Sequence, residues 1–586
     1  MNKLKPKPFR ESYFIVSDIE LDEKMNVSMI YSYGDFNTDL VHFNVEDYIN
    51  WVFKKAEIVY KASHKKKTLT VYAHFGGGFD FLFFLNEIIK KPVFIQLVMS
   101  GSLVSALYIS YKDFKINFQD SFVLFRAGLN KVAKSIIKKE KIEIDMEHRD
   151  SVSKTNMIQY CRNDCVILHE SLKKFEKDLN YPLALTMPMM GMKIFRERYL
   201  KKALPKVSLW EYNTVKYEYS FAGRVDVFRR HGTDIVHVDI NQAYPYAMKQ
   251  YGSPIGKPRQ TKAVDFKKFG FYTVKILDLN KIRENYTGFT PIRQDFKLLF
   301  GVSKVCKLTT YELMILEELN IPYKITFGME YEVDKTFFED FVDYFYNMRL
   351  DDPDMKFVSK LMLNSIQGKM AQRLDFEEIS FTPDKSEPGQ LYFNPELGLK
   401  VNPGQIKIRD YIYPAAPAAI WAANRWYLFW LLHKVHNHTY YCDTDSLAIN
   451  KSAIGELSEH IHQTRLGGLK VENEYKEAYF LAPKVYGYLQ TDGEFDFKFK
   501  GLDRGYKTEV NGELITAKEF LTKDKFKEMY ETNELLKEFK SYNLLKFKSA
   551  VKKRGFINWK WNTKKDFTFR LKRERIDIIN TKQKEL

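Results

Sequence analysis

The pattern of hydrophobic and polar positions along the chain predicts a mixture of strands and helices. Helical spacing of apolar residues over 153–179 predicts a long helix. Short apolar runs bounded by polar residues are typical of buried strands. Such runs lie at residues 13–17, 69–73, 234–240 and 271–277. Together these elements indicate an α/β domain that ends near residue 180 and a strand-rich region that begins near residue 219.

The second half of the chain carries stronger helix signals. Helical patterns lie at residues 308–319, 337–346 and 417–435. Asp352-Pro353 is a typical helix start, with Asp as the N-cap and Pro at the first helical position. We expect that helix to run to about residue 372. Residues 374–411 contain several prolines and are predicted to be an irregular insertion.

Composition narrows the class of protein. The chain has 586 residues and 45% hydrophobic content, which suits several domain-sized units. Its net charge of +17 favours a polyanionic partner such as nucleic acid, although a lysine-rich proteome is an alternative. The four cysteines form no zinc-ligand pattern, and the spacing fits a reducing compartment. Neither a signal peptide nor an apolar run long enough to span a membrane is expected.

Two acidic residues sit close together in the turn Asp443-Thr444-Asp445, between two short β-rich runs. We interpret this as a hairpin with carboxylates at its tip. The carboxylates repel each other, and a divalent cation would remove that repulsion, although a turn without function is the simpler alternative. Asp239 ends the strand predicted at 234–240, where it can meet this turn.

The helix that follows Pro353 is predicted to present a basic face. Lys356, Lys360 and Asn364 recur at i, i+4 spacing, and Gln367 continues the same face. Lysines and amides on one face can bind a triphosphate. A solvated surface with no ligand is the alternative for any single helix.

The order DINQAYP, KLMLNSIQGK, YCDTDS resembles the three polymerase motifs of family B DNA polymerases. It is most similar to the protein-primed branch of small phages and linear plasmids. The resemblance implies that Asp239 and Asp445 bind metal, with Asp443 close by and the Ile240 carbonyl as a further ligand. It also implies that residues on the basic helix face contact the nucleotide, and that a tyrosine lies under the sugar and excludes a 2′-hydroxyl. The implied nucleotide-binding residues are Tyr244, Lys356, Lys360, Asn364 and Gln367.

Further motifs extend the resemblance. Lys484-Val485-Tyr486 matches the family's KxY motif, which holds the primer terminus. Arg425 resembles a template-contacting arginine, and Lys369 ends the second motif and joins the residues expected to contact DNA. Residues 220–223 replace the family's Tyr-x-Gly-Gly linker, in which only Gly223, with Arg224 after it, fits. Gln367 stands where the family has a tyrosine that packs on the nascent base pair.

The N-terminal region carries a second acidic set. Asp18 and Glu20 share one face of a strand, and Tyr160 and Asp164 share one face of a helix. With Asp80, these residues resemble the three exonuclease motifs of proofreading polymerases. The resemblance implies two-metal hydrolysis in which all four acids bind metal and Tyr160 orients the attacking water.

Single-strand contacts are also implied for this region. Phe75 replaces the asparagine of the second exonuclease motif, which leaves primer positioning open while the carboxylates are all present. Phe79 and Phe83 could stack on bases or pack in the core. Asp120-Ser121 resembles a patch that touches single strands.

The implied fold class is a multidomain protein of α/β and α+β type, with an RNase H-like exonuclease domain followed by a right-hand polymerase of palm, fingers and thumb. The expected domains are an exonuclease at 1–180, palm at 181–259, an insertion resembling the terminal-protein region at 260–335, fingers at 336–373, an insertion resembling the strand-displacement region at 374–411, palm at 412–510, and a thumb with a basic C-terminal segment at 511–586.

The implied function is template-directed DNA synthesis with 3′→5′ proofreading, for a viral or plasmid genome. Expected cofactors are two Mg²⁺ ions per active site, with Mn²⁺ possible. Expected partners are primer-template DNA, dNTPs and a terminal protein as primer, with no membrane, for a monomer in the host cytoplasm. Two alternatives stay open: a viral polymerase primed by RNA or DNA, and a catalytically silent derivative that only binds nucleic acid.

Overall fold

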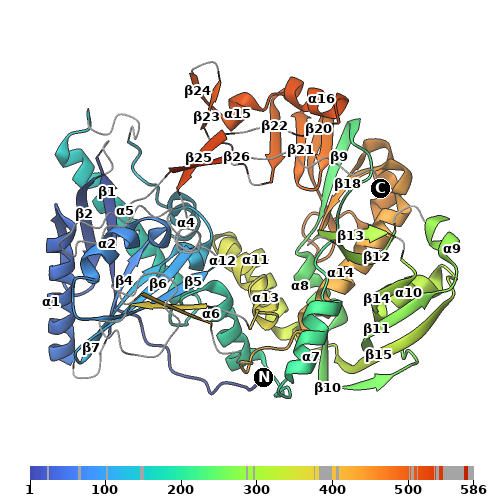
Figure 1. The fold of residues 1–586 in the computed structure, drawn as a ribbon, viewed down its shortest axis with the longest axis horizontal. Coiled ribbons are helices and arrows are strands. Elements are labelled where there is room, and N and C mark those ends of the chain that lie inside the picture. Colours follow the sequence, from blue (N-terminus) through green and yellow to red (C-terminus); the bar gives the residue numbers. More distant parts are fainter. Residues whose placement is uncertain are drawn as a thin grey trace.

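The computed structural model contains an N-terminal α/β unit joined to a larger unit built around a second sheet (Figure 1). The residues that the structure describes are 1–22, 26–63, 68–100, 103–144, 151–284, 288–294, 297–301, 303–374, 377–381, 399–403, 408–500, 502, 504, 507–510, 513–533, 535, 540–544 and 573–577. Among these residues, no helix combines the length and the apolar character that a membrane crossing requires.

The N-terminal unit is built on a nine-stranded sheet of order β17-β16-β5-β6-β7-β4-β1-β2-β3. Strand β1 pairs with β2 in antiparallel fashion and with β4 in parallel fashion. The strands of the unit's own chain segment are β1 Ile15–Leu21, β2 Val27–Gly34, β3 Thr38–His42, β4 Thr68–Ala73, β5 Phe94–Ser100, β6 Leu103–Tyr111 and β7 Phe114–Asp120. The strand expected at 13–17 therefore begins later and extends through both acidic residues.

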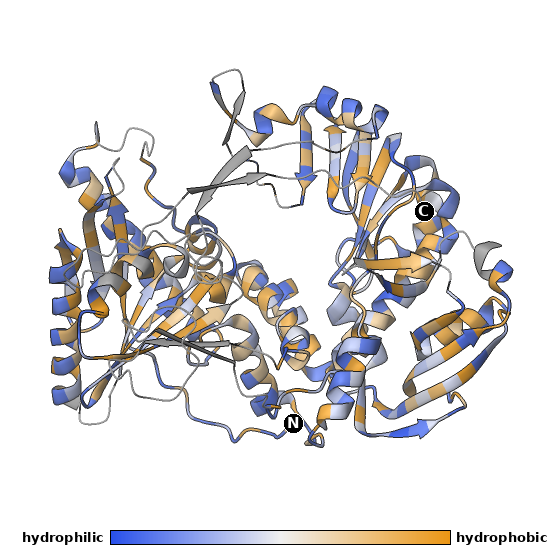
Figure 2. Cartoon of the chain, in the orientation of Figure 1, coloured by the Kyte–Doolittle hydropathy of each residue, from blue (hydrophilic) through white to orange (hydrophobic). Residues whose placement is uncertain are grey.

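Helices cover both faces of this sheet. Helices α1 (Val45–Ser63) and α2 (Asp80–Ile88) pack on one face in a single hydrophobic core. Helix α5 (Lys154–Asp178) packs on β1 and β2 in a different core and confirms the helix expected at 153–179. In Figure 2, hydrophilic residues mark the outer surface of α1. The short elements nearby are η1 Gly76–Gly78, α3 Phe122–Phe125, α4 Leu129–Ile136, α6 Met187–Ile194 and η3 Phe195–Tyr199.

The insertion expected to be irregular at 374–411 contributes two strands instead. Strands β16 (Glu377–Phe381) and β17 (Leu399–Pro403) form an antiparallel hairpin, and β16 pairs with β5 at the edge of the N-terminal sheet. Three of the prolines that suggested irregularity fall between the two strands, outside the described residues, and Pro403 ends β17. The expectation was wrong because prolines at strand ends do not interrupt a ladder.

The second unit is built on a seven-stranded sheet of order β22-β21-β20-β9-β19-β18-β8. Helices α8 (Ala243–Tyr251) and α14 (Ala415–Lys434) contribute to a core against this sheet. Strand β9 (His231–Ile240) contains the strand predicted at 234–240. The other strands are β8 Val225–Val227, β18 Thr439–Asp443, β19 Ser446–Asn450, β20 Leu469–Ala482, β21 Val485–Gln490 and β22 Phe495–Phe499.

A smaller four-stranded sheet of order β10-β15-β11-β14 is inserted after α8. Its strands are β10 Ser253–Thr261, β11 Phe269–Ile276, β14 Val305–Thr309 and β15 Tyr323–Asp334. The helix predicted at 308–319 is α10 (Thr310–Glu318), which begins two residues later because Thr309 caps it in a capping box with Glu312. The remaining elements of this region are α9 Leu279–Glu284, β12 Thr290–Gln294 and β13 Lys297–Gly301.

The helix expected from Pro353 to about residue 372 is broken in two. Asp352 does act as the N-cap, but α12 (Lys356–Leu363) and α13 (Ile366–Met370) are separated at Asn364-Ser365. Asn364 Nδ2 donates to the Lys360 carbonyl at 3.0 Å and Ser365 Oγ to the Met362 carbonyl at 2.7 Å. Side chains that bond the last carbonyls of a helix compete with its continuation. Two neighbouring elements complete this region, α11 Glu339–Asp351 and η5 Pro353–Met355.

The C-terminal elements pack on the far end of the large sheet. Helices α15 (Ala517–Phe520) and α16 (Lys523–Glu531) share a core with β20, β21 and β22. In Figure 1 this region lies at the top, and its hairpins extend toward the N-terminal unit. The remaining elements are α7 Leu209–Asn213, η4 Thr214–Tyr219, η6 His436–His438, η7 Lys451–His460, β23 Lys507–Val510, β24 Glu513–Thr516, β25 Lys540–Leu544 and β26 Arg573–Asp577.

Candidate active sites

The turn between β18 and β19 holds its two aspartates in a strained conformation. Thr444, at the tip, has a φ of 64°, which is unfavourable for a β-branched residue. Two neighbours hold it there: Thr444 N donates to the Arg224 carbonyl at 2.6 Å, and Asn424 Nδ2 donates to the Thr444 carbonyl at 2.7 Å. The hairpin expected from the sequence is therefore confirmed, and its tip is fixed from outside the hairpin.

Asp239 lies beside this turn because β9 and β19 are paired. Ser446 is opposite Asp239 in the register, and Ile240 N donates to the Asp445 carbonyl at 2.7 Å. Burial and the charge of Asp445 raise the pKa of Asp239 to about 7, and burial and Asp443 raise the pKa of Asp445 to about 6. Each carboxylate is costly to ionise here without a nearby cation.

A further carboxylate, which the sequence did not single out, lies on β20. Glu472 contributes to the raised pKa of both Asp239 and Asp445. Its neighbour Lys470 is opposite Asp239 in the register of β20 and β9. The only sequence signal is its place in the run LKVENEYK, which is ordinary for an exposed strand. The half-buried Asp239 and Asp445 and the exposed Glu472 form an oxygen-rich set that fits a hard divalent cation such as Mg²⁺.

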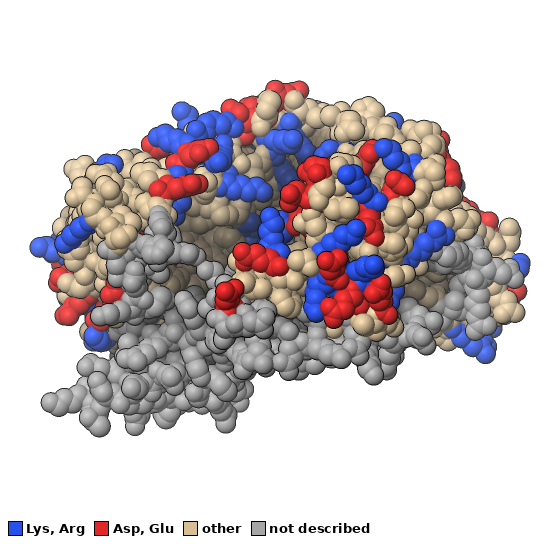
Figure 3. Space-filling model, turned by 90° about the horizontal axis from the view of Figure 1, so that it is seen from above, with Lys and Arg blue, Asp and Glu red and all other residues tan. Residues whose placement is uncertain are grey.

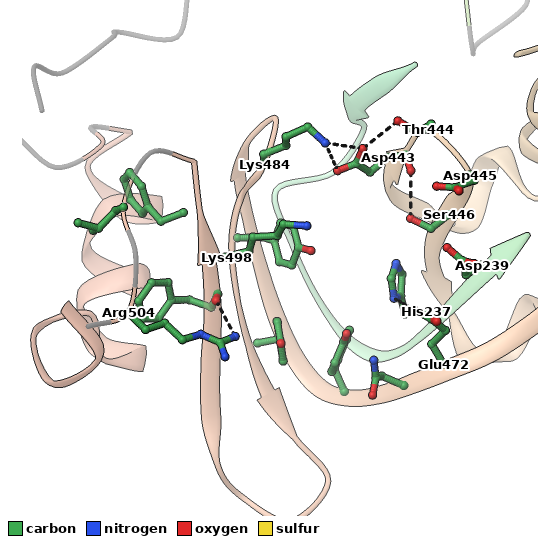
Figure 4. A pocket seen from close by; sticks show the side chains of 17 residues that line it. His237, Asp239, Asp443, Thr444, Asp445, Ser446, Glu472, Lys484, Lys498 and Arg504 are labelled. Atoms are coloured by element: carbon green, nitrogen blue, oxygen red, sulfur yellow. Dashed lines mark hydrogen bonds and ion pairs between the residues drawn. The ribbon is translucent and has the colours of Figure 1, made fainter. Parts of the chain in front are cut away.

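Asp443 is already neutralised by a lysine. Lys484 Nζ donates to both carboxylate oxygens of Asp443, at 2.7 and 2.6 Å (Figure 4). The backbone N–H of Lys484 also donates a hydrogen bond to the hydroxyl of Tyr441 at 3.0 Å. The lysine of the KxY motif is thus bound to the catalytic turn, while Tyr486 packs on Tyr441.

These groups border a cavity of ≈ 820 Å³ on the concave side of the large sheet (Figure 4). Its acidic end carries Asp239, Asp445 and Glu472, and its other end carries Lys498 and Arg504. Such a volume is within the range of small-molecule sites. The polarity of the lining suits a ligand that has both phosphates and bound cations.

The basic helix face is only partly as expected. Lys356, Lys360 and Asn364 are exposed, and the charge of Lys360 lowers the pKa of both Asp239 and Asp445, so Lys360 faces the carboxylates. Gln367 does not share this face. It is buried and accepts a hydrogen bond from Trp421 Nε1 at 2.7 Å, because the break before α13 rotates it away.

Two more residues of the expected nucleotide and DNA contacts are half-buried. Tyr244 lies on α8, where burial and the charge of Asp445 raise its pKa to about 12. Lys369 Nζ lies 5.0 Å from the ring centre of Tyr411. Burial and the charge of Arg409 lower the pKa of Lys369 to about 8. Tyr244 is therefore close to the catalytic turn, and Lys369 lies within a basic surrounding.

The template contact expected of Arg425 stays a prediction, and the polar atoms of this side chain are bonded inside the protein. Its guanidinium is buried, pairs with Glu312 at 2.7 Å and donates to the Phe221 carbonyl. It thereby ties α14 to α10 and to the linker. No nitrogen on a side chain this enclosed is left to meet DNA without breaking those bonds.

The linker residues Gly223 and Arg224 contact the Asp443-Thr444-Asp445 turn and do not form an exposed surface. A Cβ on Gly223 would lie 2.6 Å from Thr444 Cγ2, so only glycine allows this approach. The side chain of Arg224 is buried and bonds Asp226 at 2.7 Å, while its carbonyl holds the turn. The expected direct contact of Arg224 with DNA is therefore corrected to a positioning role.

The N-terminal acids converge from three elements. Asp18 and Glu20 lie on β1, Asp80 begins α2 and Asp164 lies on α5. Burial raises the pKa of Asp18, and so do the charges of Glu20, Asp164 and Asp80. Asp80 Oδ1 accepts from Ile19 N at 3.1 Å, and the other elements are brought together around it.

This set fits a metal as well. Burial raises the pKa of Asp80 and of Asp164, which means that the hydrogen bond from Ile19 N and the charge of Lys141 only partly compensate the ionised forms. Asp164 Oδ1 is buried and has no hydrogen-bond partner. A buried carboxylate oxygen without a partner is unfavourable unless a cation or water meets it.

Lys141 is a second residue, after Glu472, that the sequence did not single out and that lies in a candidate site. Its Nζ binds Asp164 Oδ2 at 2.5 Å and lies 4.5 Å from the ring centre of Tyr160. In the sequence it ends the basic run KKEK, where no spacing separates it from surface lysines. Only the approach of residue 141 to α5 gives it a place in the site.

The aromatic and polar residues expected to grip single strands divide into two kinds. Phe75 is exposed, whereas Phe79 and Phe83 are half-buried and pack on the domain core. The ring centres of Phe79 and Phe83 are 5.4 Å apart. Ser121 is buried, contacts His74 Nδ1 at 2.9 Å and donates to the Ala73 carbonyl. The hydroxyl of Ser121 is bonded inside the domain, and its expected contact with a single strand stays a prediction.

Comparisons with known proteins agree with this architecture. The family "DNA polymerase type B, organellar and viral" matches residues 133–457. A probable DNA polymerase of Neurospora intermedia is 26% identical over 498 residues, covering 75% of this chain and 48% of that protein. The DNA polymerase of Bacillus phage phi29 is 25% identical over 347 residues, covering 56% and 58%. The chain thus spans about half the length of these curated relatives.

A solved structure is similar over nearly the whole chain. The ternary complex of phi29 DNA polymerase with primer-template DNA and incoming nucleotide has a TM-score of 0.70 and 17% identity, and covers 98% of this chain and 100% of that one. At this identity the likeness concerns the fold. The fold agrees with the expected class, an exonuclease unit followed by palm, fingers and thumb. By the family match over more than half of its length, the chain belongs to the organellar and viral type B DNA polymerases.

Proposed function

We propose that this protein is a template-directed DNA polymerase with a 3′→5′ proofreading exonuclease. The observation that carries the proposal is the presence of two separate carboxylate sets in one chain, largely buried in the N-terminal unit and half-buried on the large sheet, each beside a lysine. The basic charge of the chain supports a nucleic-acid partner. Seen from above, Lys and Arg side chains border a hollow in the surface (Figure 3).

The polymerase site would be formed by Asp239, Asp445 and the carbonyl of Ile240 as metal ligands, with Asp443 close by. Bound Mg²⁺ or Mn²⁺ would activate the primer 3′-hydroxyl and stabilise the leaving pyrophosphate. Lys360, which faces the carboxylates, would bind the triphosphate and offset its charge. A matching role in neutralising phosphates follows for Lys356.

The remaining groups of this site would orient the substrates. Tyr244 is beside Asp445 and would lie under the incoming sugar. Tyr486 and Lys484 would hold the primer terminus, which requires that Lys484 keep or share its bond to Asp443. Asn364 would bind phosphate from the exposed end of α12. Gln367 would act through Trp421 instead of touching the nascent pair.

The exonuclease site would be formed by Asp18, Glu20, Asp80 and Asp164 as metal ligands. The unpartnered Asp164 Oδ1 supports this assignment. Bound cations would generate the attacking hydroxide. The hydroxyl of Tyr160 would orient the water, and Lys141 would hold both Tyr160 and Asp164 in place.

The domain limits expected from the sequence are proposed with one refinement. We propose the exonuclease at 1–180, the palm at 181–259 and 412–510, and the fingers at 336–373. The inserted hairpin β16–β17 joins the exonuclease sheet, which suits a segment that meets DNA between the two units. The thumb is proposed for residues 511–586.

Initiation from a terminal protein is the finer part of the proposal. The four-stranded sheet, whose strands lie between residues 253 and 334, is a suitable docking element between the two palm segments. RNA or DNA priming is the alternative. The discriminating test is transfer of dAMP to a Ser, Thr or Tyr of a small basic protein encoded beside this chain, and failure of that transfer favours ordinary priming. We propose a monomer that works in the host cytoplasm.

The direct test is primer extension. Purified protein with Mg²⁺, a primed template and dNTPs should extend the primer, and Asp445→Ala should remove that activity. An inactive wild-type protein with intact DNA binding would support the silent binding derivative. Extension that survives Asp445→Ala would overturn the assignment of the site.

A further inference from the structure

The N-terminal carboxylate set includes a thiol that the proposed hydrolysis does not use. Cys161 lies on α5 with its side chain buried, and its Sγ is 3.6 Å from both Asp18 Oδ2 and the Asp18 carbonyl. Ligand atoms of Asp18, Glu20 and Cys161 all lie within 4.8 Å of one another. Within the described residues, no other three His, Cys, Asp or Glu side chains have ligand atoms within this distance of one another.

The spacing matches that of metal ligands. A thiolate at about 2.3 Å and a carboxylate oxygen at about 2.1 Å from a tetrahedral Zn²⁺ are roughly 3.6 Å apart. The sulfur and oxygen of Cys161 and Asp18 are already at that separation. Ligand atoms held at the required distance need little rearrangement to bind.

A second, independent feature points to a cation at the same place. Asp164 is 4% exposed, and its Oδ1 has no hydrogen-bond partner, while Oδ2 is held by Lys141. Its charge also contributes to the raised pKa of Asp18, so Asp164 lies near this group. The three close ligand atoms are those of Asp18, Glu20 and Cys161, and Asp164 lies beside them.

The other carboxylate site provides the contrast. Cys442 directly precedes Asp443, but successive residues of a strand point to opposite faces. Its side chain is buried in the core between the large sheet and α14. The polymerase site therefore offers no thiolate, although His237 adds a nitrogen to its oxygen ligands, whereas the N-terminal site offers oxygen and sulfur.

We propose that Asp18, Glu20 and Cys161 form a mixed carboxylate–thiolate site that takes a thiophilic divalent cation such as Zn²⁺ or Cd²⁺. On binding, the Cys161 thiol loses its proton to solvent as the sulfur–metal bond forms. Asp18 and Glu20 are also proposed ligands of the catalytic cations, so a thiophilic cation held there with Cys161 would displace those cations. Occupancy would therefore silence proofreading while synthesis continues. That consequence rests on the proposed exonuclease, but the binding does not.

The test of binding is spectroscopic and uses the full chain. Co²⁺ alone serves as the probe, because a cobalt–thiolate bond gives a charge-transfer band in the near ultraviolet. The band should appear for the wild type and for Cys165→Ser and be absent for Cys161→Ser. Cys165 is a matched control, because it is equally buried one turn later and donates to the Tyr31 carbonyl. A band that is absent in the wild type, or that survives Cys161→Ser, overturns the proposal.

Folding and affinity are measured on the same samples. Circular dichroism should report Cys161→Ser as folded; Asp18→Asn, which keeps the sulfur, is the second variant and should also weaken the band. Loss of even an outer partner of a metal ligand costs about 10- to 100-fold in affinity, so Cys161→Ser should weaken Zn²⁺ binding by at least about tenfold. Unchanged Zn²⁺ affinity in both variants overturns the proposal.

The consequence for DNA is then tested in buffer with excess Mg²⁺. Added Zn²⁺ should stop degradation by the wild type at concentrations at which Cys161→Ser still degrades DNA, and primer extension should continue in both. Equal sensitivity of the two proteins overturns the inhibitory role. If neither protein degrades DNA at any Zn²⁺ level while the cobalt band is present, the exonuclease assignment fails and the metal site stands.

Discussion

The two carboxylate sites of this protein solve the same electrostatic problem with different surroundings. Each has acids on a central strand, Asp18 and Glu20 in one and Asp239 in the other, and each meets further acids from a second element. In both, burial and mutual repulsion raise carboxylate pKa values. The comparison teaches that clustering of acids alone does not distinguish the sites.

The difference lies in which acid each lysine neutralises. In the N-terminal site, Lys141 pairs with Asp164, one of the proposed ligands. In the polymerase site, Lys484 pairs with Asp443 and leaves Asp239 and Asp445 exposed to each other. We infer that a bound cation would relieve more carboxylate repulsion in the polymerase site. In the N-terminal site, Lys141 already offsets part of the charge of a proposed ligand, Asp164.

The largest expected effect separates the two activities. Asp445→Asn should lower primer extension by at least about a thousandfold, because it removes a metal ligand whose charge stabilises the transition state. Degradation of the same primer should remain. Asp18→Asn should do the reverse. Both are measured by gel electrophoresis of a labelled primer with and without dNTPs, and a variant that loses both activities would contradict two independent sites.

The next effect concerns the lysines. Lys141→Met should lower degradation by about a hundredfold, because electrostatic and proton-transfer groups contribute on that scale. Extension should be unaffected. Lys484→Met frees Asp443 and should lower extension while sparing degradation. Single-turnover rates for the two reactions give the measurement, and the comparison breaks if either lysine affects both reactions equally.

A smaller effect is expected at the linker. In Gly223→Ala the new Cβ would lie 2.6 Å from Thr444, so the turn must shift and extension should fall about tenfold, the scale of a small misplacement in a site. Gly455→Ala is the matched control, because nothing lies within 4 Å of its Cβ. Equal extension rates for the two variants would show that the linker does not position the turn.

The smallest effect is a pH dependence of stability. The pKa of Asp239 is raised from 3.8 to about 7 in the fold, so its ionisation destabilises the fold as pH rises from about 4 through 7. In metal-free buffer, Asp239→Asn should therefore raise the melting temperature by a few degrees at pH 8 and leave it unchanged at pH 4. Calorimetry checks this, and a stabilisation that is equal at both pH values would refute the assigned cause.

The sequence predicted the chemistry of the sites better than their surroundings. The hairpin at Asp443-Thr444-Asp445 and the approach of Asp239 followed from strand ends and turn chemistry. Lys141 and Glu472 could not be foreseen, because each joins its site through tertiary packing alone. The hydrophobic pattern along the chain cannot reveal such a residue, because it carries no information about contacts between distant segments.

Residues identified by resemblance divided in the same way. The resemblance implied that Arg425 and Ser121 contact DNA. In the structure both side chains are buried, and their polar atoms form bonds within the protein. Gln367 left its expected face because local side-chain bonds broke the helix at Asn364-Ser365. Spacing predicts a shared face only while a helix continues, and the competing bonds lie beyond the reach of a periodic pattern.

The most direct measurement uses a labelled primer that ends in a mismatch on its template. With Mg²⁺ and dNTPs, the wild-type chain should first shorten the primer by removing the mismatched nucleotide and then extend it beyond its original length. Asp18→Asn should abolish the shortening step. If the wild type extends the mismatched primer without shortening it, or neither shortens nor extends it, the claim that this one chain holds a polymerase and a proofreading site is contradicted.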